Sequence, residues 1–159
     1  MKNKKITSMD SVVTKKVITV PTGTTVSQAE AVMKENRIRH LPVVDENDEI
    51  VGVVTARDVA NIESSHKYTV ELFMIAPVEF INQRESLRTS ILRILEKKIS
   101  CLLVTDDNEN VVGIVTTDDI LWHLAHLLSE ESEDNRHFIG AMGLQIIGDI
   151  ANKLSIMGI

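Results

Sequence analysis

The chain has 159 residues, of which 43% are hydrophobic, so it can bury a core as one unit or as two small halves that share one. A formal net charge of −6 argues against a nucleic-acid-binding face, because phosphate contacts require clustered lysine and arginine. Its single cysteine, Cys101, excludes an internal disulfide and cysteine-rich metal sites and is expected to be a small core residue. No apolar run approaches the roughly 20 residues of a membrane span, so a cytoplasmic protein is expected.

The first predicted elements belong to a mixed α+β unit. Residues 1–8 show no periodicity and are predicted to be flexible. Val17–Val20 is a β-branched run that predicts a strand. Thr25 and Gln28 have the spacing of a capping box, so a helix is expected from there to about Asn36.

The best-defined feature of the sequence is a hairpin. Leu41–Val44 and Ile50–Val54 are short apolar runs, and the polar residues 45–49 between them suit a hairpin connection. The second run leads directly into a helix that is predicted from Ala56 to about Glu63. Backbone N–H groups at such a helix start attract anions. This half of the chain therefore has the predicted order β-α-β-β-α.

A similar sequence recurs 61 residues later. Residues 38–59 align with residues 99–120 without a gap, and ten of the twenty-two positions are identical. The copy has a predicted strand at Val78–Ile81, a helix that carries Leu87 and Leu95, a second hairpin, and a helix from Thr117 to about Leu128. We therefore predict two repeats, residues 9–66 and 67–129, packed as a pseudo-twofold pair.

Residues 130–159 lie outside the duplication. Glu130–Asp134 is read as a charged spacer, so the second repeat is expected to end near Ser129. Beyond the spacer, apolar residues recur at spacings of three and four and predict a C-terminal amphipathic helix: Phe138, Ile139, Met142, Ile146, Ile147, Ile150 and Leu154.

Each half carries a set of ordered motifs. In the first they are Leu41–Asp45, Val51-Gly52 and Thr55–Asp58. In the second they are Leu102–Asp106, Val112-Gly113 and Thr116–Asp119, with Leu103 in place of a proline. With these motifs each half resembles a CBS domain, the module first recognised in cystathionine β-synthase, and the pair resembles the tandem arrangement called a Bateman module.

The resemblance implies a regulatory module, not an enzyme, whose clefts between the paired domains bind an adenosine-containing ligand. AMP, ADP and ATP are the expected ligands, with S-adenosylmethionine and NAD as further members of the class. In such modules the aspartate of Thr-x-x-Asp holds the ribose hydroxyls and the threonine lies near ribose and phosphate. The resemblance assigns these roles to Thr55 with Asp58 and to Thr116 with Asp119. It places two further segments near the adenine: Lys16, Val17 and Ile18, and Pro77, Val78 and Glu79.

Basic residues favour the first of the two clefts. Arg57 stands at the predicted helix start, where a guanidinium can bind phosphate bidentately. Arg39 and His40 precede the hairpin, where the resemblance implies groups that face phosphate. The counterparts of these residues in the second copy are Asp118, Ser100 and Cys101, so phosphate binding is expected to be weak there. Lys97 and Lys98 could offset this loss, but they are expected to face water at a helix end.

A simpler explanation stays open for each candidate. Thr55 and Asp58 can cap a helix without any ligand, and the resulting fold could serve as a ligand-free assembly module. Arg57 can be a solvated surface residue, and His40 can be a half-buried histidine with an ordinary hydrogen bond.

The expected partners are a second copy of the chain and an effector protein that the sequence does not name. A pair of such repeats would expose apolar helix faces, which a homodimer would cover: Ile120, Leu121, Leu124 and Leu128. Trp122 is expected to anchor this interface. His123 and His126 share a helix face without a nearby third ligand, so no metal site is predicted.

Overall fold

The structure is a computed structural model that describes residues 9–131, with side chains described for residues 9–129. The chain divides into two units, residues 1–120 and 121–159, and each is described by itself. Two expectations lie outside the described residues: the flexible N-terminus at residues 1–8 and the amphipathic helix beyond the charged spacer.

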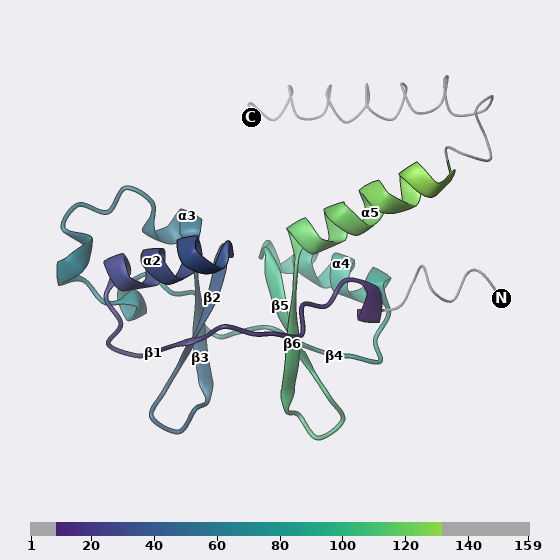
Figure 1. Ribbon diagram of the computed structural model, residues 1–159. Helices are drawn as coiled ribbons and strands as arrows, with labels where there is room; N and C mark the ends of the chain where they lie inside the picture. The colour runs from purple at the N-terminus through teal and green to yellow at the C-terminus, as the bar shows by residue number, and fades with distance from the viewer. Residues whose placement is uncertain (1–8, 132–159) are drawn as a thin grey trace. The chain divides into compact units, whose positions relative to one another are not determined.

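The first unit contains two three-stranded sheets (Figure 1). The elements of the first repeat are β1 (Val20–Pro21), α2 (Val26–Asn36), β2 (His40–Val44), β3 (Ile50–Thr55) and α3 (Ala56–Val59). Those of the second are β4 (Phe80–Asn82), α4 (Leu87–Lys97), β5 (Cys101–Thr105), β6 (Val111–Thr116) and α5 (Thr117–Glu131). In each sheet the first strand pairs in parallel with the second, and the second pairs antiparallel with the third. The predicted α+β class and the β-α-β-β-α order are confirmed.

The local signals of the sequence explain where the helices and turns form. Thr25 and Gln28 form the predicted capping box at the start of α2, and Ser86 accepts from the backbone N–H of Thr89 at the start of α4. In the two hairpin turns, Asp45 and Asp106 accept backbone N–H groups two and four residues ahead. The backbone hydrogen bonds lower the pKa of the Asp45 carboxyl. At Asp106 the side-chain amide of Asn110 lowers the carboxyl pKa most, and the backbone hydrogen bonds add to this effect.

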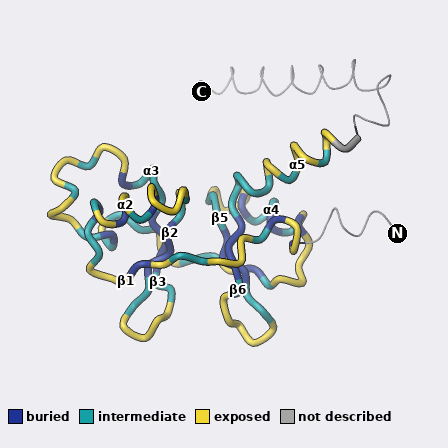
Figure 2. Tube along the Cα trace, viewed as in Figure 1, coloured by how far each residue is buried: buried dark blue, intermediate teal, exposed yellow. Residues whose placement is uncertain are grey.

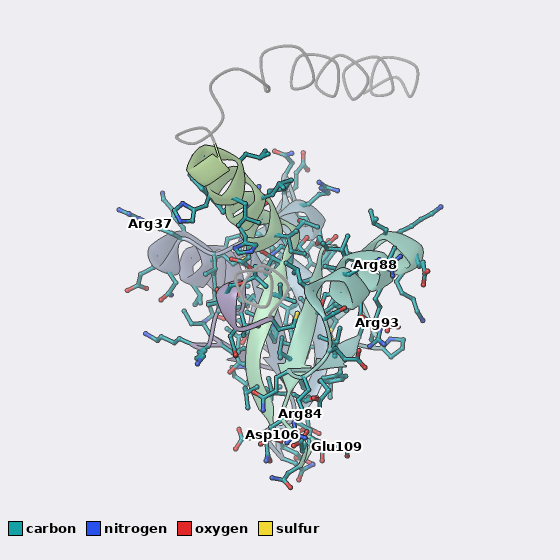
Figure 3. The ribbon with its side chains drawn as sticks, turned by 90° about the vertical axis from the view of Figure 1, so that its right-hand side faces the viewer. Arg37, Arg84, Arg88, Arg93, Asp106 and Glu109 are labelled. Carbon is teal, nitrogen blue, oxygen red and sulfur yellow. The ribbon has the colours of Figure 1, made fainter. Side chains whose placement is uncertain are left out.

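Each sheet carries its own core, and burial follows the central strands while the hairpin turns are exposed (Figure 2). Figure 3 shows Arg84, Asp106 and Glu109 at the tip of the second hairpin, where Arg84 also forms an ion pair with Asp107. The hairpin tips are therefore exposed, and burial is concentrated in the middle of the central strands.

The segments that precede β1 and β4 are exchanged between the repeats. Thr14 forms a two-way backbone bridge to Ile114 on β6, with N···O distances of 2.9 and 3.0 Å. Ile75, which lies 61 residues after Thr14, forms the matching bridge to Val53 on β3. In Figure 1 the N-terminal segment starts beside α4 and crosses to β1. The reciprocal contacts give the pair its pseudo-twofold relation, and they pair one residue on each of the edge strands β3 and β6.

The exchange extends into the cores. Met9 and Val12 are buried in the second core, although the sequence assigns them to the first repeat. Val70 is buried in the first core, and Phe73 and Met74 pack against it. Each core is thus completed by a short segment that the sequence assigns to the other repeat.

Three elements differ from their predicted lengths. The helix expected from Ala56 to Glu63 ends at Val59, because Asn61 has a φ of 63° and turns the chain so that Ile62 packs against the core. The strands expected at Val17–Val20 and Val78–Ile81 begin only at Val20 and Phe80, because the preceding residues cross between the sheets. In contrast, α5 is longer than predicted: it ends at Glu131, so the first residues of the expected spacer are helical.

Candidate functional site

A cavity of about 480 Å³ lies where the two repeats meet. Its lining includes five of the predicted site residues: Arg39, His40, Thr55, Arg57 and Asp58. The second repeat contributes Lys98, Ile99, Ser100 and Thr117. The volume falls within the range of roughly 300–1,000 Å³ that is usual for small-molecule sites. Both repeats therefore form the wall of one cavity.

Thr55 and Asp58 are held in a reciprocal capping box at the start of α3. The carboxylate Oδ2 of Asp58 accepts from the backbone N–H and the hydroxyl of Thr55, at 2.9 and 2.7 Å, and the Thr55 hydroxyl accepts from the Asp58 N–H at 3.3 Å. Thr116 and Asp119 form the same box with distances of 2.8, 2.6 and 3.2 Å. Both bonds to each carboxylate end on Oδ2, so Oδ1 can still accept from a ligand hydroxyl. The capping explanation and the binding explanation are therefore compatible.

The exchanged segments change which predicted residues meet. Val78 lies in a crevice that adjoins the cavity, and this crevice is also lined by Pro77, Glu79 and Thr55. The second segment therefore lies beside the motif of the first repeat. Among the other predicted residues, Ile18 packs against the first core, and neither Lys16 nor Val17 is among the residues that line the cavity.

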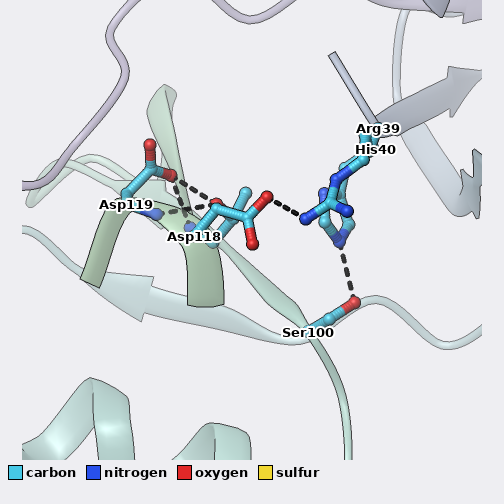
Figure 4. A network of polar contacts seen from close by, with 6 residues as sticks. Arg39, His40, Ser100, Asp118 and Asp119 are labelled. Carbon is cyan, nitrogen blue, oxygen red and sulfur yellow. Dashed lines mark hydrogen bonds and ion pairs between the residues drawn. The ribbon is translucent and has the colours of Figure 1, made fainter. Parts of the chain in front are cut away.

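Two side-chain contacts bridge the repeats beside the cavity (Figure 4). The Arg39 guanidinium forms an ion pair with the Oδ2 of Asp118, and the His40 Nε2 lies 2.7 Å from the Ser100 hydroxyl oxygen. Asp118 was expected to repel phosphate from the second cleft; in the structure it neutralises one of the cations expected to serve the first. Arg39 and Asp118 are both more than two-fifths exposed, so the ion pair adds little stability.

A family model described as CBS domain matches residues 9–65 and again residues 70–126. The chain belongs to the CBS domain family. Its fold is similar to that of a CBS domain pair solved in complex with 5′-methylthioadenosine and S-adenosyl-L-methionine, with a TM-score of 0.65, 30% identity, and coverage of 72% of this chain and 93% of the other.

Two curated relatives of the CBS pair come from Methanocaldococcus jannaschii. An L-aspartate semialdehyde sulfurtransferase is 32% identical over 115 residues, which are 72% of this chain and 23% of the relative. An inosine-5′-monophosphate dehydrogenase is 36% identical over 115 residues, which are 70% of this chain and 22% of the relative. The chain thus spans less than a quarter of the length of these two enzymes.

The charge around the cavity of this CBS pair is set by a small number of side chains. Arg39, Arg57 and Lys98 are its cationic lining residues, and Asp58 is its carboxylate. The helix starts contribute less than the sequence suggested, because the first N–H groups of α3 and α5, those of Ala56 and Thr117, donate to the carbonyls of Arg39 and Ser100. A ligand phosphate would have to be bound mainly by side chains.

Lys98 has a second role in the structure that its sequence position did not indicate. Lys97 and Lys98 are both exposed at the end of α4, as expected, and the Lys97 Nζ lies 3.0 Å from a Glu79 carboxylate oxygen. Lys98 also lines the cavity beside residues of the first repeat. Its sequence position gives no signal of this, because the contact depends on how the two repeats pack.

Cys101 is half-buried and lines the crevice that also contains Val78. Burial, and to a smaller extent the Asp58 carboxylate, raises the pKa of the Cys101 thiol to about 11. The thiol is therefore protonated at neutral pH, which makes it a poor nucleophile.

Within residues 9–129, no group of three or more histidine, cysteine and acidic side chains is arranged to hold a metal ion. None of the helices described is both long and apolar enough to cross a membrane.

Burial lowers the pKa of His40 below its ordinary value, an effect that the nearby Arg39 reinforces and the carboxylates of Asp118, Asp119 and Asp58 oppose. The unfolded chain therefore binds a proton at higher pH than the folded chain does. We expect the free energy of unfolding to be largest above about pH 6.5 and to fall as the pH drops through the lower folded-state pKa. Urea unfolding at a series of pH values measures this, and His40→Gln should flatten the dependence. An equal slope in that variant would contradict the assignment to His40.

Proposed function

We propose that this CBS pair is a regulatory module that binds an adenosine-containing ligand between its repeats and signals its presence to an effector protein. The observation that carries this proposal is the cavity in which Asp58 and Thr55 adjoin Arg57. A carboxylate can accept both hydroxyls of a ribose, and a guanidinium nearby can bind phosphate. The ligands of the similar solved pair, both adenosine derivatives, support the same class.

An adenine nucleotide, AMP, ADP or ATP, fits the charge of the cavity better than S-adenosylmethionine does. Its lining has three cationic side chains against one carboxylate, and two of the three, Arg57 and Lys98, are not paired with an acidic side chain in the described part of the chain. Phosphate groups are attracted to such a wall, whereas the sulfonium of S-adenosylmethionine would be repelled. NAD also carries phosphates and belongs to the ligands to be tested.

Titration calorimetry with AMP, ADP, ATP, NAD, S-adenosylmethionine and adenosine tests the proposal. We expect a dissociation constant in the micromolar range for at least one adenine nucleotide, which corresponds to about −8 kcal/mol. The absence of binding by every adenosine compound would leave the ligand-free assembly module as the better explanation. The Arg39–Asp118 and His40–Ser100 contacts favour that second function, because they join the repeats without a ligand.

We further propose that the protein acts as a homodimer held by the helices that follow the hairpins. On α5, Leu121 is 61% exposed and Trp122 is 78% exposed, and Leu124 and Leu128 are also exposed. Exposed apolar side chains at this density are typical of an interface. Ile120 was expected to join them, but it packs against the second core.

Trp122→Glu is expected to convert the dimer to a monomer at micromolar concentration without reducing nucleotide affinity, because the cavity is lined by other residues. Analytical ultracentrifugation measures the change. Truncation after Ser129 should weaken the dimer and leave nucleotide binding intact. If the full-length protein sediments as a monomer, the dimer proposal is wrong. If the truncated form dimerises as tightly as the full-length protein, the dimer stands and only the proposed role of the C-terminal segment is wrong.

A further inference from the structure

Lys98 adopts a backbone conformation that favours glycine. It follows the last residue of α4 with φ 54° and ψ 40°, and its N–H donates to the carbonyls of Ile94 and Leu95. Left-handed residues that end a helix in this way are most often glycine, because a Cβ is unfavourable there. A long basic side chain at this position therefore calls for a reason other than helix termination.

Arg37 is the matching residue of the first repeat and provides an internal comparison. It ends α2 with φ 55° and ψ 39°, and its N–H donates to the carbonyls of Met33 and Lys34. The two caps share one backbone geometry but have different surroundings. Arg37 lines a separate depression next to α2 and is absent from the lining of the cavity, whereas Lys98 lines the cavity with Arg57 and Asp58.

The other basic groups at the cavity are already engaged. Arg39 is paired with Asp118, and His40 is hydrogen-bonded to Ser100. Within the described part of the chain, Arg57 and Lys98 are the cavity-lining cations that form no ion pair. One belongs to the first repeat and the other to the second.

We propose that Lys98 is the specificity-determining residue of the cleft, supplied by the second repeat to bind the ligand's phosphates opposite Arg57. This inference rests on the proposed function and names the chemistry that the cleft selects, a chain of two or three phosphates carried on adenosine. A phosphate chain held by both residues joins the repeats, so ligand charge is sensed across the boundary between them. The glycine-favouring conformation of Lys98 is retained because glycine would remove this contact.

Lys98→Gly, with Arg37→Gly as the matched control, tests the proposal by calorimetry and thermal unfolding. Both variants should unfold at a higher temperature than the original protein, because glycine adopts the left-handed backbone conformation without the steric cost of a Cβ. Lys98→Gly should lower the affinity for ATP about tenfold, as expected for loss of one charge-assisted contact, and should leave adenosine affinity unchanged. Arg37→Gly should leave both affinities unchanged. Equal ATP affinity in Lys98→Gly and the original protein would overturn the proposal.

Inorganic tripolyphosphate separates this inference from the proposed function. If tripolyphosphate stabilises the original protein but not Lys98→Gly, while adenosine compounds show no specific binding, Lys98 forms the anion site and the adenosine function is wrong. If ATP binds equally well to both proteins, the adenosine function stands and the role of Lys98 is wrong. If neither tripolyphosphate nor any adenosine compound binds the original protein, both proposals fail.

Discussion

Asp58→Ala is expected to lower the affinity for an adenosine ligand about 100-fold, whereas Asp119→Ala should change it less than about threefold. The physical reason is the position of the cavity. Asp58 lines it, and Asp119 is not among its lining residues. Loss of the carboxylate removes two charge-assisted hydrogen bonds to the ribose and leaves its hydroxyls unpaired in a confined site. Titration calorimetry with the best-binding nucleotide measures both affinities.

The two variants are well matched in stability. Asp58 and Asp119 accept the same pair of hydrogen bonds from Thr55 and Thr116, and both are half-buried. Each substitution should therefore cost about 1 kcal/mol of unfolding free energy. Because the stability losses are equal, a difference in affinity reports the ligand contact alone. Equal losses of affinity at both positions would show that the two clefts are equivalent.

Gly113→Ala is expected to destabilise the protein by about 3 kcal/mol, the upper end of the usual cost of overpacking. A Cβ at this position would overlap the Cγ1 of Val13 and lie 3.0 Å from the carbonyl oxygen of Thr14. Thr14 is held in place by its backbone bridge to Ile114, so it cannot move away without breaking that bridge. Urea denaturation measures the loss.

Gly52→Ala is the matched control, because Gly52 is the counterpart of Gly113 in the first repeat. Its Cβ would meet only the side chain of Met74, which is flexible enough to move, so the expected loss is about 1 kcal/mol. Adding Val13→Ala to Gly113→Ala should recover part of the lost stability, since it removes the overlapping methyl group. If Gly113→Ala lowers the free energy of unfolding no more than Gly52→Ala does, the close contact with the Thr14 backbone is not the cause of the destabilisation.

The elements that could be predicted from the sequence are those with local causes. The hairpins follow from β-branched runs around polar turns, and the start of α2 follows from Thr25 and Gln28. The motif at Thr55 and Asp58 was placed correctly at a strand-to-helix junction. In each case the residues that decide the structure lie within a few positions of one another.

The exchange of the segments at Thr14 and Ile75 could not be predicted in the same way, because it joins residues about 100 and 22 positions apart in the chain. One signal was present: a glycine inside each predicted strand, which often marks the close approach of another backbone. The place of Lys98 depends on the same packing. The group of residues at the cavity was therefore only partly foreseen.

The exchanged segments also bear on the order in which the chain can reach its native state during synthesis. The residues that build the first core, from Ile18 to Met74, are contiguous, so this core can close as soon as they have emerged. Met9 and Val12 are made earlier, yet the core residues of β5 and β6 with which they pack are made about 90 to 106 residues later. The first described residues of the chain therefore cannot reach their native contacts until β5 and β6 have been made, and the second core closes only when these segments pack together.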